Sequence, residues 1–283
     1  MHDLNTKIAI LILFFEKPGQ TIECIKSFIP SGCKIYLLNN GSSENATKKV
    51  EKFISEINHV SYFKLEKNLG PAGGRNKLII ESTEEWLFLV DSDITVSPGN
   101  WIELFDRENK NDPGTDIFLP ELYNVHEKSY AIHPLFVNEN NHIKIKPDEV
   151  KRINYFPSGA SIVRRKVLNV NNLFDPNLHG FEDYEFAIRN LVSGEKYKIH
   201  KIKSIMLKHD HRFANSQDDK NAIKTRYSQE KLSNSFKYIE QKFNITFEHE
   251  WEWWNKKQIY EMTQKSLWTE LKRKIYRLIF KYS

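Results

Sequence analysis

The apolar run at residues 86–90 ends in two carboxylates, Asp91 and Asp93, that stand one residue apart. A run of five apolar residues is too short for a buried helix and is typical of a central strand covered on both faces. Ligands bind at the carboxyl ends of strands in open α/β sheets, where two acids can hold a divalent cation that in turn binds phosphate. A plain acidic turn is the alternative, because Asp and Ser are frequent in turns.

Strand-like and helix-like segments alternate through the N-terminal third of the chain. The expected strands are residues 8–15, 34–38, 60–65 and 86–93, and the expected helices are residues 21–28, 43–57 and 77–82. Such alternation is typical of a parallel sheet wound with crossover helices, so we predict an α/β fold. Further along, the pattern predicts a helix at 101–107, a hairpin of 129–137 with 142–145, a strand at 160–163, a helix at 182–192, and strands at 196–202 and 204–208.

The composition is that of a globular protein in a reducing compartment. Apolar residues make up 40% of the 283 residues, enough to fill the core of a large domain. Cys24 and Cys33 match no zinc or redox spacing, which favours a reduced, cytosolic setting without disulfides. The longest apolar run has eight residues against the roughly 20 of a membrane-spanning helix, and it lacks a signal-peptide pattern. We therefore expect a cytoplasmic protein, either soluble or peripheral at the inner face of the cell membrane.

The net charge of +5 is concentrated at the C-terminal end. Residues 256–283 hold eight Lys and Arg against two Glu, a charge of +6, so the rest of the chain sums to about −1. This distribution argues against a nucleic-acid-binding surface on the main part of the protein. It predicts a local basic surface at the C-terminal end. Leu271, Ile275, Leu278 and Ile279 form an apolar stripe there, which predicts a helix that either lies on an anionic membrane or packs on the protein or a second subunit.

Four polar segments follow expected strands and could carry chemistry. They are residues 39–43, 68–76, 91–93 and 180–185. Glycines in the second segment would let the backbone approach a ligand, and Arg75 beside a helix N-terminus favours a diphosphate. Asp183, in the last segment, could act as a general base. Each segment alone has an ordinary explanation: tight turns for the first three, and acids favoured by the helix macrodipole for the last.

Together these segments resemble the family-2 glycosyltransferases of GT-A fold over residues 5–215. The resemblance lies in the order of an Asn-Gly-Ser turn, an NxGxAGGxN loop, a strand ending in DxD, a Phe-Asp-Pro segment before Gly-Phe-Glu-Asp, and a later His. It implies a Rossmann-like, mostly parallel central sheet flanked by helices. It also implies a catalytic domain over 1–215, with a nucleotide-sugar-binding half at 1–98 and an acceptor half at 99–215. A helical, basic, aromatic-rich C-terminal extension would follow over 216–283.

The resemblance also implies roles for individual residues. Asp91 would contact the nucleotide sugar, Asp93 would coordinate Mn²⁺ or Mg²⁺, and Asp183 would be the general base. The remaining expected residues are the donor contacts Asn39, Asn40, Asn68, Gly70, Gly74, Arg75 and Ser92, the acceptor contact Glu182, and the metal ligand His209. His209 and His211 could equally be ordinary surface residues, and His209 is preferred because it directly follows an apolar strand. Asn39 stands where the family usually has Asp, which leaves the nucleotide base open.

The resemblance predicts an inverting, metal-dependent glycosyltransferase. It would move a sugar from a nucleotide-diphosphate sugar, expected to be a UDP sugar, to a hydroxyl of a glycan or lipid-linked acceptor in bacterial surface polysaccharide synthesis. One alternative is a sugar nucleotidyltransferase, although residues 14–19 lack the glycine-rich basic loop usual after the first strand of such enzymes. The other alternative is a non-catalytic carbohydrate-binding protein. The presence of all three acids, Asp91, Asp93 and Asp183, argues against it. The acceptor and the oligomeric state stay open.

Overall fold

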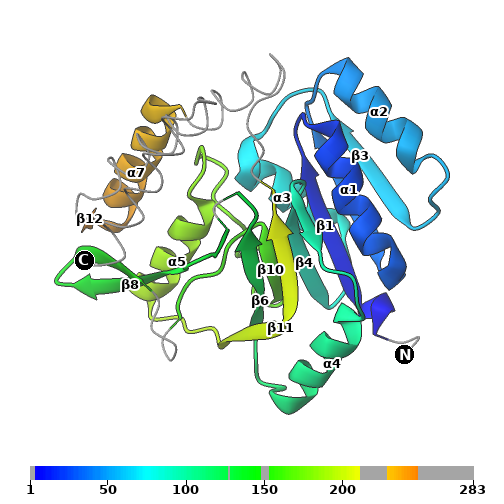
Figure 1. The fold of residues 1–283 in the computed structure, drawn as a ribbon. Coiled ribbons are helices and arrows are strands. Elements are labelled where there is room, and N and C mark those ends of the chain that lie inside the picture. The colour runs from blue at the N-terminus through cyan, green and yellow to red at the C-terminus, as the bar shows by residue number, and fades with distance from the viewer. Residues whose placement is uncertain (1–3, 127, 148–152, 211–227, 248–283) are drawn as a thin grey trace.

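The computed structural model describes residues 4–126, 128–147, 153–210 and 228–247. Its N-terminal third consists of four parallel strands joined by helices (Figure 1). The strands are β1 (Ile8–Phe14), β2 (Lys34–Asn40), β3 (Val60–Leu65) and β4 (Trp86–Asp91). The joining elements are α1 (Pro18–Phe28), α2 (Glu44–Ile54) and α3 (Gly70–Glu81), with the short 3₁₀ turns η1 (Asn5–Lys7) and η2 (Ile29–Ser31). The parallel pairs give the order β3-β2-β1-β4, which confirms the predicted alternation.

Beyond β4 the same sheet becomes mixed. The added strands are β5 (Ile94–Val96), β6 (Ile117–Asn124), β7 (Ser129–Tyr130), β10 (Ala160–Arg164) and β11 (Ile199–His209). The order from β4 is β10-β6-β11-β5, with β7 paired to β6. β10 is antiparallel to both neighbours and β11 is parallel to β6, so β11 runs in the direction of β4. Two strands were predicted where β11 is continuous, because an irregularity between Ile202 and Met206 interrupts its apolar pattern.

A second, three-stranded sheet is separate from the central one. It contains β8 (Pro134–Glu139), β9 (His142–Pro147) and β12 (Thr246–Phe247). β8 and β9 form the predicted antiparallel hairpin. Its turn residues Asn140 and Asn141 have φ of 54° and 65°, a conformation that Asn tolerates better than most residues. The remaining helices are α4 (Trp101–Asn111), α5 (Glu182–Ser193) and α7 (Gln229–Phe243).

The central strands are apolar throughout because both faces of the sheet are covered. Alternate residues of β1 point to opposite faces, so Ile10 and Ile12 pack with α1, α2 and α4, whereas Ala9 and Leu11 pack with α3 and α5. The face of the sheet that packs with α1, α2 and α4 is densely filled. The ring of Trp86, for example, lies edge-on against that of Phe105, with 5.1 Å between the centroids. This packing explains why an unbroken apolar run, rather than an alternating one, leads to Asp91.

The predicted glycine loop at residues 68–76 is wrong in one respect, because α3 already begins at Gly70. The glycines instead let the start of α3 approach β1, since a Cβ on Gly74 would lie 2.4 Å from Leu13 Cδ1. The predicted turn at residues 39–43 also starts late. Asn39 and Asn40 end β2 as fully buried strand residues, and the chain turns only at Gly41.

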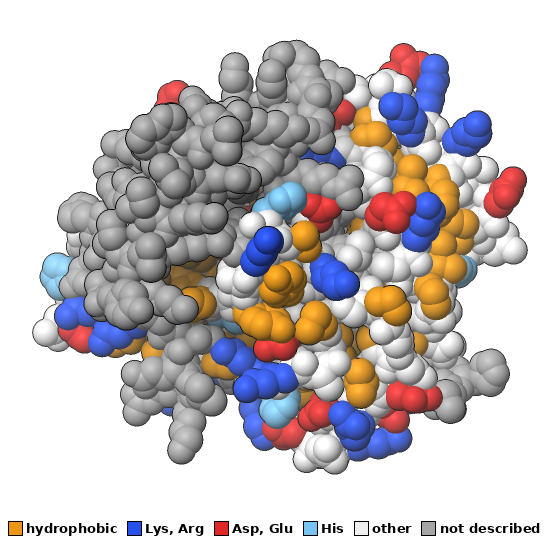
Figure 2. Space-filling view, viewed as in Figure 1, with side chains coloured by type: hydrophobic (Ala, Val, Ile, Leu, Met, Phe, Trp, Pro, Cys, Tyr) orange, Lys and Arg blue, Asp and Glu red, His pale blue; other side chains and the backbone are white. Residues whose placement is uncertain are grey.

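Only part of the predicted C-terminal extension is described. α7 and β12 pack through Phe236 and Phe247 into an apolar cluster that includes Ile188 of α5. The apolar stripe from Leu271 to Ile279, with its membrane and packing hypotheses, lies outside the described residues. No helix among the described residues is long and apolar enough to cross a membrane. Figure 2 shows acidic and basic side chains interspersed over the described part of one face.

Gly41 makes the turn after β2 sensitive to any side chain. Its φ is +77°, and a Cβ would lie 2.6 Å from the backbone nitrogen of Asn68. We expect Gly41→Ala to lower the free energy of unfolding by about 2 kcal/mol or more, because the left-handed backbone and the clash both cost energy. Gly19→Ala is the matched control, since nothing lies within 4 Å of its Cβ position. Urea unfolding checks this, and equal stabilities of the two variants would contradict it.

Candidate active site

The expected site residues gather at one edge of the central sheet. β2, β4 and β11 run in the same direction, so their final residues Asn40, Asp91 and His209 lie along the same edge. The N-terminal turn of α5, which holds Glu182 and Asp183, is joined to this edge by direct contacts. The fold therefore brings together residues that are far apart in the chain.

Arg75 of α3 joins the acid at the end of β4 to the first acid of α5. Its Nη1 donates to Glu182 Oε1 at 2.7 Å, and its Nη2 forms an ion pair with Asp91. Its Nε donates to the carbonyl oxygen of Ser158 at 2.8 Å. The Arg75 side chain is only 7% exposed, so a buried guanidinium compensates the charge of two carboxylates. The structure places Arg75 between Asp91 and Glu182, and the expected contact of Arg75 with a diphosphate stays a prediction.

Gly159 provides the space in which the Asp91 carboxylate lies. A Cβ at this position would approach Asp91 Cγ to 2.3 Å, and the backbone N–H of Asp91 donates to the carbonyl of Gly159 at 2.9 Å. The neighbouring Ser158 hydroxyl donates to Glu182 Oε1 at 2.8 Å. The short segment before β10 therefore fixes both acids of the Arg75 cluster.

Asp183 is the second acid of α5 and lies beside this cluster. The Tyr155 hydroxyl donates to Asp183 Oδ2 at 2.6 Å, and the N–H of Ser158 approaches the same oxygen at 3.5 Å. Burial and the Glu182 carboxylate raise the pKa of Asp183 to about 7, against the lowering effects of the Tyr155 hydrogen bond and of Arg75. A carboxyl group with a pKa near neutrality is suited to accept a proton and to release it again.

Asp93 and His209 form a second pair at the same edge. Asp93 lies in the turn between β4 and β5, and the pairing of β5 with β11 brings its Oδ1 to 3.3 Å from His209 Nε2. The Asp93 carbonyl accepts a hydrogen bond from the N–H of Asp210 at 2.9 Å. The structure thus brings together the two residues expected to bind metal.

The Asp93 and His209 pair fits a divalent cation. Adjacent ligands of an octahedral ion with bonds of about 2.1 Å lie roughly 3 Å apart, close to the observed separation. Within the described ranges, no group of three or more His, Cys, Asp or Glu could hold a metal by itself. This agrees with an ion that is bound by few protein ligands and completed by substrate phosphates and water.

Asn39 and Asn40 use their amides inside the protein. Asn39 Nδ2 donates to Thr47 Oγ1 at 2.7 Å. Asn40 Nδ2 donates to the carbonyl of Gly70 at 3.0 Å, and its Oδ1 accepts from the N–H of Leu69 at 2.9 Å. These bonds position the start of α3 next to the turn after β2. A direct contact of Asn39 and Asn40 with the nucleotide-sugar donor stays a prediction.

Two other expected donor residues, Asn68 and Ser92, lie nearer the surface. Asn68 is exposed, its Oδ1 accepts from the N–H of Gly70 at 2.7 Å, and Ser92 is half-buried in the turn between the two acids. The sequence did not reveal Tyr155, Ser158 and Gly159, which touch the acids. A glycine directly before a predicted strand was the one available signal for this segment.

The model of the family described as "Glycosyl transferase family 2" matches residues 9–170, more than half of the chain. The chain belongs to this family. The enzyme class expected from the sequence, a glycosyltransferase, is thereby confirmed at the level of the family.

Characterised and uncharacterised glycosyltransferases resemble the chain at low identity. An uncharacterized glycosyltransferase of Methanocaldococcus jannaschii is 22% identical over 71% of this chain and 70% of its own length. The cholesterol galactosyltransferase of Borreliella burgdorferi is 24% identical over 67% of this chain and 56% of its own length. The pre-mycofactocin glycosyltransferase of Mycobacterium tuberculosis is 22% identical over 64% of this chain and 38% of its own length. The chain thus spans about half or less of the length of the latter two relatives.

Solved structures confirm the GT-A type of fold. S. aureus TarS 1-349 in complex with UDP has a TM-score of 0.55 and 18% identity, covering 79% of this chain and 65% of that one. GalNAc-T7 with UDP, GalNAc and Mn²⁺ has a TM-score of 0.57 and 16% identity, covering 90% of this chain and 57% of that one. At such identities the likeness concerns the fold alone.

The buried ion pairs of Arg75 predict a large effect of removing its charge. We expect Arg75→Met to lower the free energy of unfolding by about 3 kcal/mol or more, because two acids would lose their buried partner. Arg107→Met is the control, since the Arg107 side chain is 58% exposed; we expect a change within about 0.5 kcal/mol. Urea unfolding compares the two variants, and an Arg75 variant as stable as its control would show that these ion pairs do not stabilise the fold.

Proposed function

We propose that the protein is an inverting, metal-assisted glycosyltransferase that uses a nucleotide-diphosphate sugar. The observation that carries the proposal is that Asp91 at the end of β4 and Glu182 of α5 pair with one buried arginine, Arg75. Asp183, whose pKa burial raises to about 7, follows Glu182 directly and lies beside this cluster. The donor would lie against the half at residues 1–98, and the acceptor against the half at residues 99–215.

Asp93 and His209 would hold Mn²⁺ or Mg²⁺ in this proposal. The bound ion supplies positive charge that stabilises the diphosphate as the bond to the sugar breaks. Asp91 would contact the sugar from its fixed position beside Gly159. Asn68, Gly70, Gly74 and Ser92 would contribute further donor contacts.

Asp183 would remove the proton from the attacking acceptor hydroxyl. Tyr155 holds Asp183 Oδ2, which fixes the orientation of the carboxylate before the acceptor binds. Glu182 is held by Arg75 and Ser158, and it would orient the acceptor rather than share the role of base. Attack opposite the leaving diphosphate is a single displacement, so the product would have the inverted anomeric configuration.

The donor is proposed to be a UDP sugar. Three solved structures of this fold support the choice, namely TarS with UDP, TarS with UDP-GlcNAc, and GalNAc-T7 with UDP and Mn²⁺. For the acceptor we propose a hydroxyl of a glycan or lipid-linked molecule in bacterial surface polysaccharide synthesis. The Borreliella relative, whose name states a lipid acceptor, supports this class. The family match favours transfer over the nucleotidyltransferase and non-catalytic alternatives.

Loss of the metal or of Asp93 should stop the reaction. We expect the protein with Mn²⁺ to release UDP from at least one of UDP-Glc, UDP-Gal, UDP-GlcNAc and UDP-GalNAc, and EDTA to abolish this release. Asp93→Ala should reduce the rate by about 100-fold or more while the fold persists, because the ion no longer stabilises the leaving group. Asp106→Ala is the control, since Asp106 pairs with Lys110 on the surface of α4. A wild-type rate for Asp93→Ala at saturating Mn²⁺ would place the metal elsewhere.

Replacing Asp183 should separate turnover from donor binding. We expect Asp183→Asn to bind UDP with Mn²⁺ normally but to lose about 100-fold or more in kcat, because an amide cannot accept the proton. The wild-type kcat should fall about tenfold per pH unit below pH 7 and level off above it, because only the carboxylate form is a base. Calorimetry and pH-rate profiles check this, and NMR of the product reports its anomeric configuration. Weaker UDP binding with unchanged turnover would make Asp183 a binding residue.

A further inference from the structure

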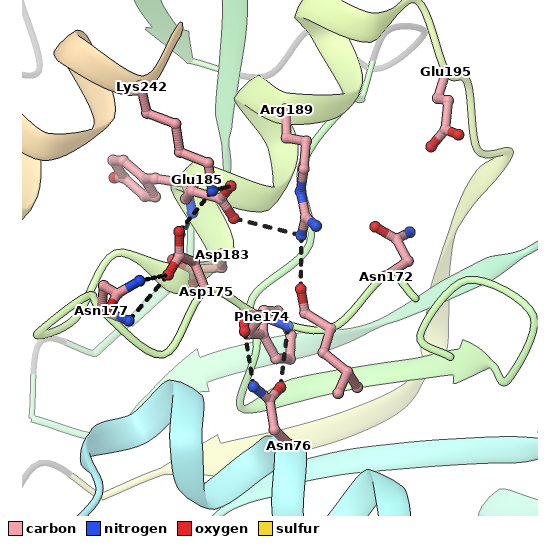
Figure 3. Close-up of polar contacts among 12 residues, drawn as sticks. Asn76, Asn172, Phe174, Asp175, Asn177, Asp183, Glu185, Arg189, Glu195 and Lys242 are labelled. Carbon is pink, nitrogen blue, oxygen red and sulfur yellow. Dashed lines mark hydrogen bonds and ion pairs between the residues drawn. The ribbon is translucent and has the colours of Figure 1, made fainter. Parts of the chain in front are cut away.

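Lys242, near the C-terminal end of α7, reaches into a buried acidic site beside α5. Figure 3 shows its side chain extending from α7 to two carboxylates, Asp175 and Glu185. Its Nζ lies 2.6 Å from Asp175 Oδ2 and 2.9 Å from Glu185 Oε1. The Glu185 side chain is 0% exposed and that of Asp175 is 8% exposed. Lys242 therefore pairs with both buried acids from a separate helix, and Glu185 also pairs with Arg189 of its own helix at 3.4 Å.

The two acids stand at the ends of the segment that carries Asp183. Asp175 begins this segment, and Glu185 lies in the first turn of α5, two residues after Asp183. Phe174, just before Asp175, is bound through both backbone groups to the amide of Asn76 in α3, at 2.7 and 3.0 Å. One end of the segment is thus attached to the donor half, and α7 holds both ends through Lys242.

Other residues of α7 contact the middle of the same segment. The N–H of His179 donates to Ser235 Oγ at 2.9 Å. The ring of Phe236 lies edge-on against Phe181, with 4.4 Å between the centroids. Phe181 has a φ of 63°, a conformation that costs energy in an L-residue and must be held by its surroundings. The backbone immediately before Glu182 and Asp183 therefore depends on contacts with α7.

The pKa shifts of Lys242 and Asp175 favour the charged form of both groups. Burial alone would lower the pKa of Lys242, but Asp175 and Glu185 raise it above the ordinary lysine value. Burial would raise the pKa of Asp175, but Lys242, Asn177 and Tyr238 lower it below the ordinary value. Lys242 and Asp175 are therefore both charged at neutral pH, and their contact, which joins α7 to the segment before α5, is an ion pair.

We propose that Lys242 is a positioning residue for Asp183, because its pairs with Asp175 and Glu185 fix residues 175–185 against α7. The inference rests on the proposed function in that Asp183 is the base whose position matters. Lys242 itself touches no substrate in this proposal. Its effect is on how often Asp183 is correctly placed for proton transfer, so it should change turnover and leave donor binding unchanged.

The test compares three variants with the wild-type protein. Lys242→Met removes the cation and keeps much of the aliphatic chain, Glu185→Gln removes one acid with little change in shape, and Lys237→Met is the control. Lys237 is an exposed residue on the same helix, so its variant undergoes the same chemical change outside the site. Thermal unfolding identifies any variant that has lost its fold. If Lys242→Met is such a variant, Glu185→Gln alone tests the proposal.

Hydrogen exchange gives a readout that needs no activity. We expect Lys242→Met and Glu185→Gln to accelerate exchange about tenfold or more in peptides from residues 174–186, because the first turn of α5 opens more often. Peptides from β4 should exchange as in the wild type, and so should all peptides of Lys237→Met. Unchanged exchange at 174–186 in a folded Lys242→Met or Glu185→Gln protein would overturn the proposal whether or not the protein transfers sugar.

Kinetic measurements then test whether the contacts of Lys242 affect turnover. With a donor that the wild type consumes, we expect Lys242→Met to lower kcat about tenfold or more, with the Kd of UDP in Mn²⁺ unchanged within about twofold. Lys242→Arg should recover most of the loss, because it restores the charge. The double variant Lys242→Met with Glu185→Gln should lose little more than the worse single variant, since both act through one contact. A wild-type kcat, a weaker UDP affinity with unchanged kcat, or additive losses would each overturn the positioning role.

If the wild-type protein releases UDP from none of the donors, the proposed function is contradicted. The claim that Lys242 fixes residues 175–185 is not. The hydrogen-exchange comparison would still decide whether Lys242 fixes residues 175–185. Conversely, an active wild type with normal turnover in Lys242→Met would reject the positioning role and leave the proposed function intact. The two proposals therefore fail in different measurements.

Discussion

The site depends on one buried cation, the guanidinium of Arg75. It lies between acids from β4 and α5 that would repel each other if they met without it. Removing three charged groups from water is costly, and the cost is offset only when each finds partners in good geometry. Arg75 meets this condition because its planar group reaches Asp91, Glu182 and the carbonyl of Ser158 at once. Arg75 thereby joins the end of β4 to the start of α5.

Close backbone approach is what makes this arrangement sterically possible. Gly159 leaves room for the Asp91 carboxylate, and Gly74 lets α3 lie close enough to β1 for Arg75 to reach the sheet edge. The amide of Asn40 then ties the start of α3 to the end of β2. Glycines and buried amides at this edge therefore serve geometry first, and a ligand would meet groups that are already in place.

The acids of α5 are supported from two directions. Arg75 and Ser158 hold Glu182 from the sheet side, whereas Lys242 holds Glu185 from α7. Asp183 lies between these contacts; burial and Glu182 raise its pKa, and the hydrogen bond from Tyr155 opposes them. Because Asp183 shares its helix turn with two paired acids, it has little freedom to move. The described helix α7 is thus packed against the segment that carries Asp183.

The sequence by itself determined the parallel half of the sheet and the acids at its edge. An unbroken apolar run predicts a strand covered on both faces, and residues directly after such strands must lie at the carboxyl edge. Local pattern could not show that α3 starts at Gly70, because the helix is stabilised there by packing on β1 rather than by its own propensity. Only the tertiary structure decided that Arg75 binds two acids, that Tyr155 holds Asp183, and that Lys242 reaches Glu185. These contacts join segments distant in sequence, and their energies depend on burial and orientation, which exist only once the chain has folded.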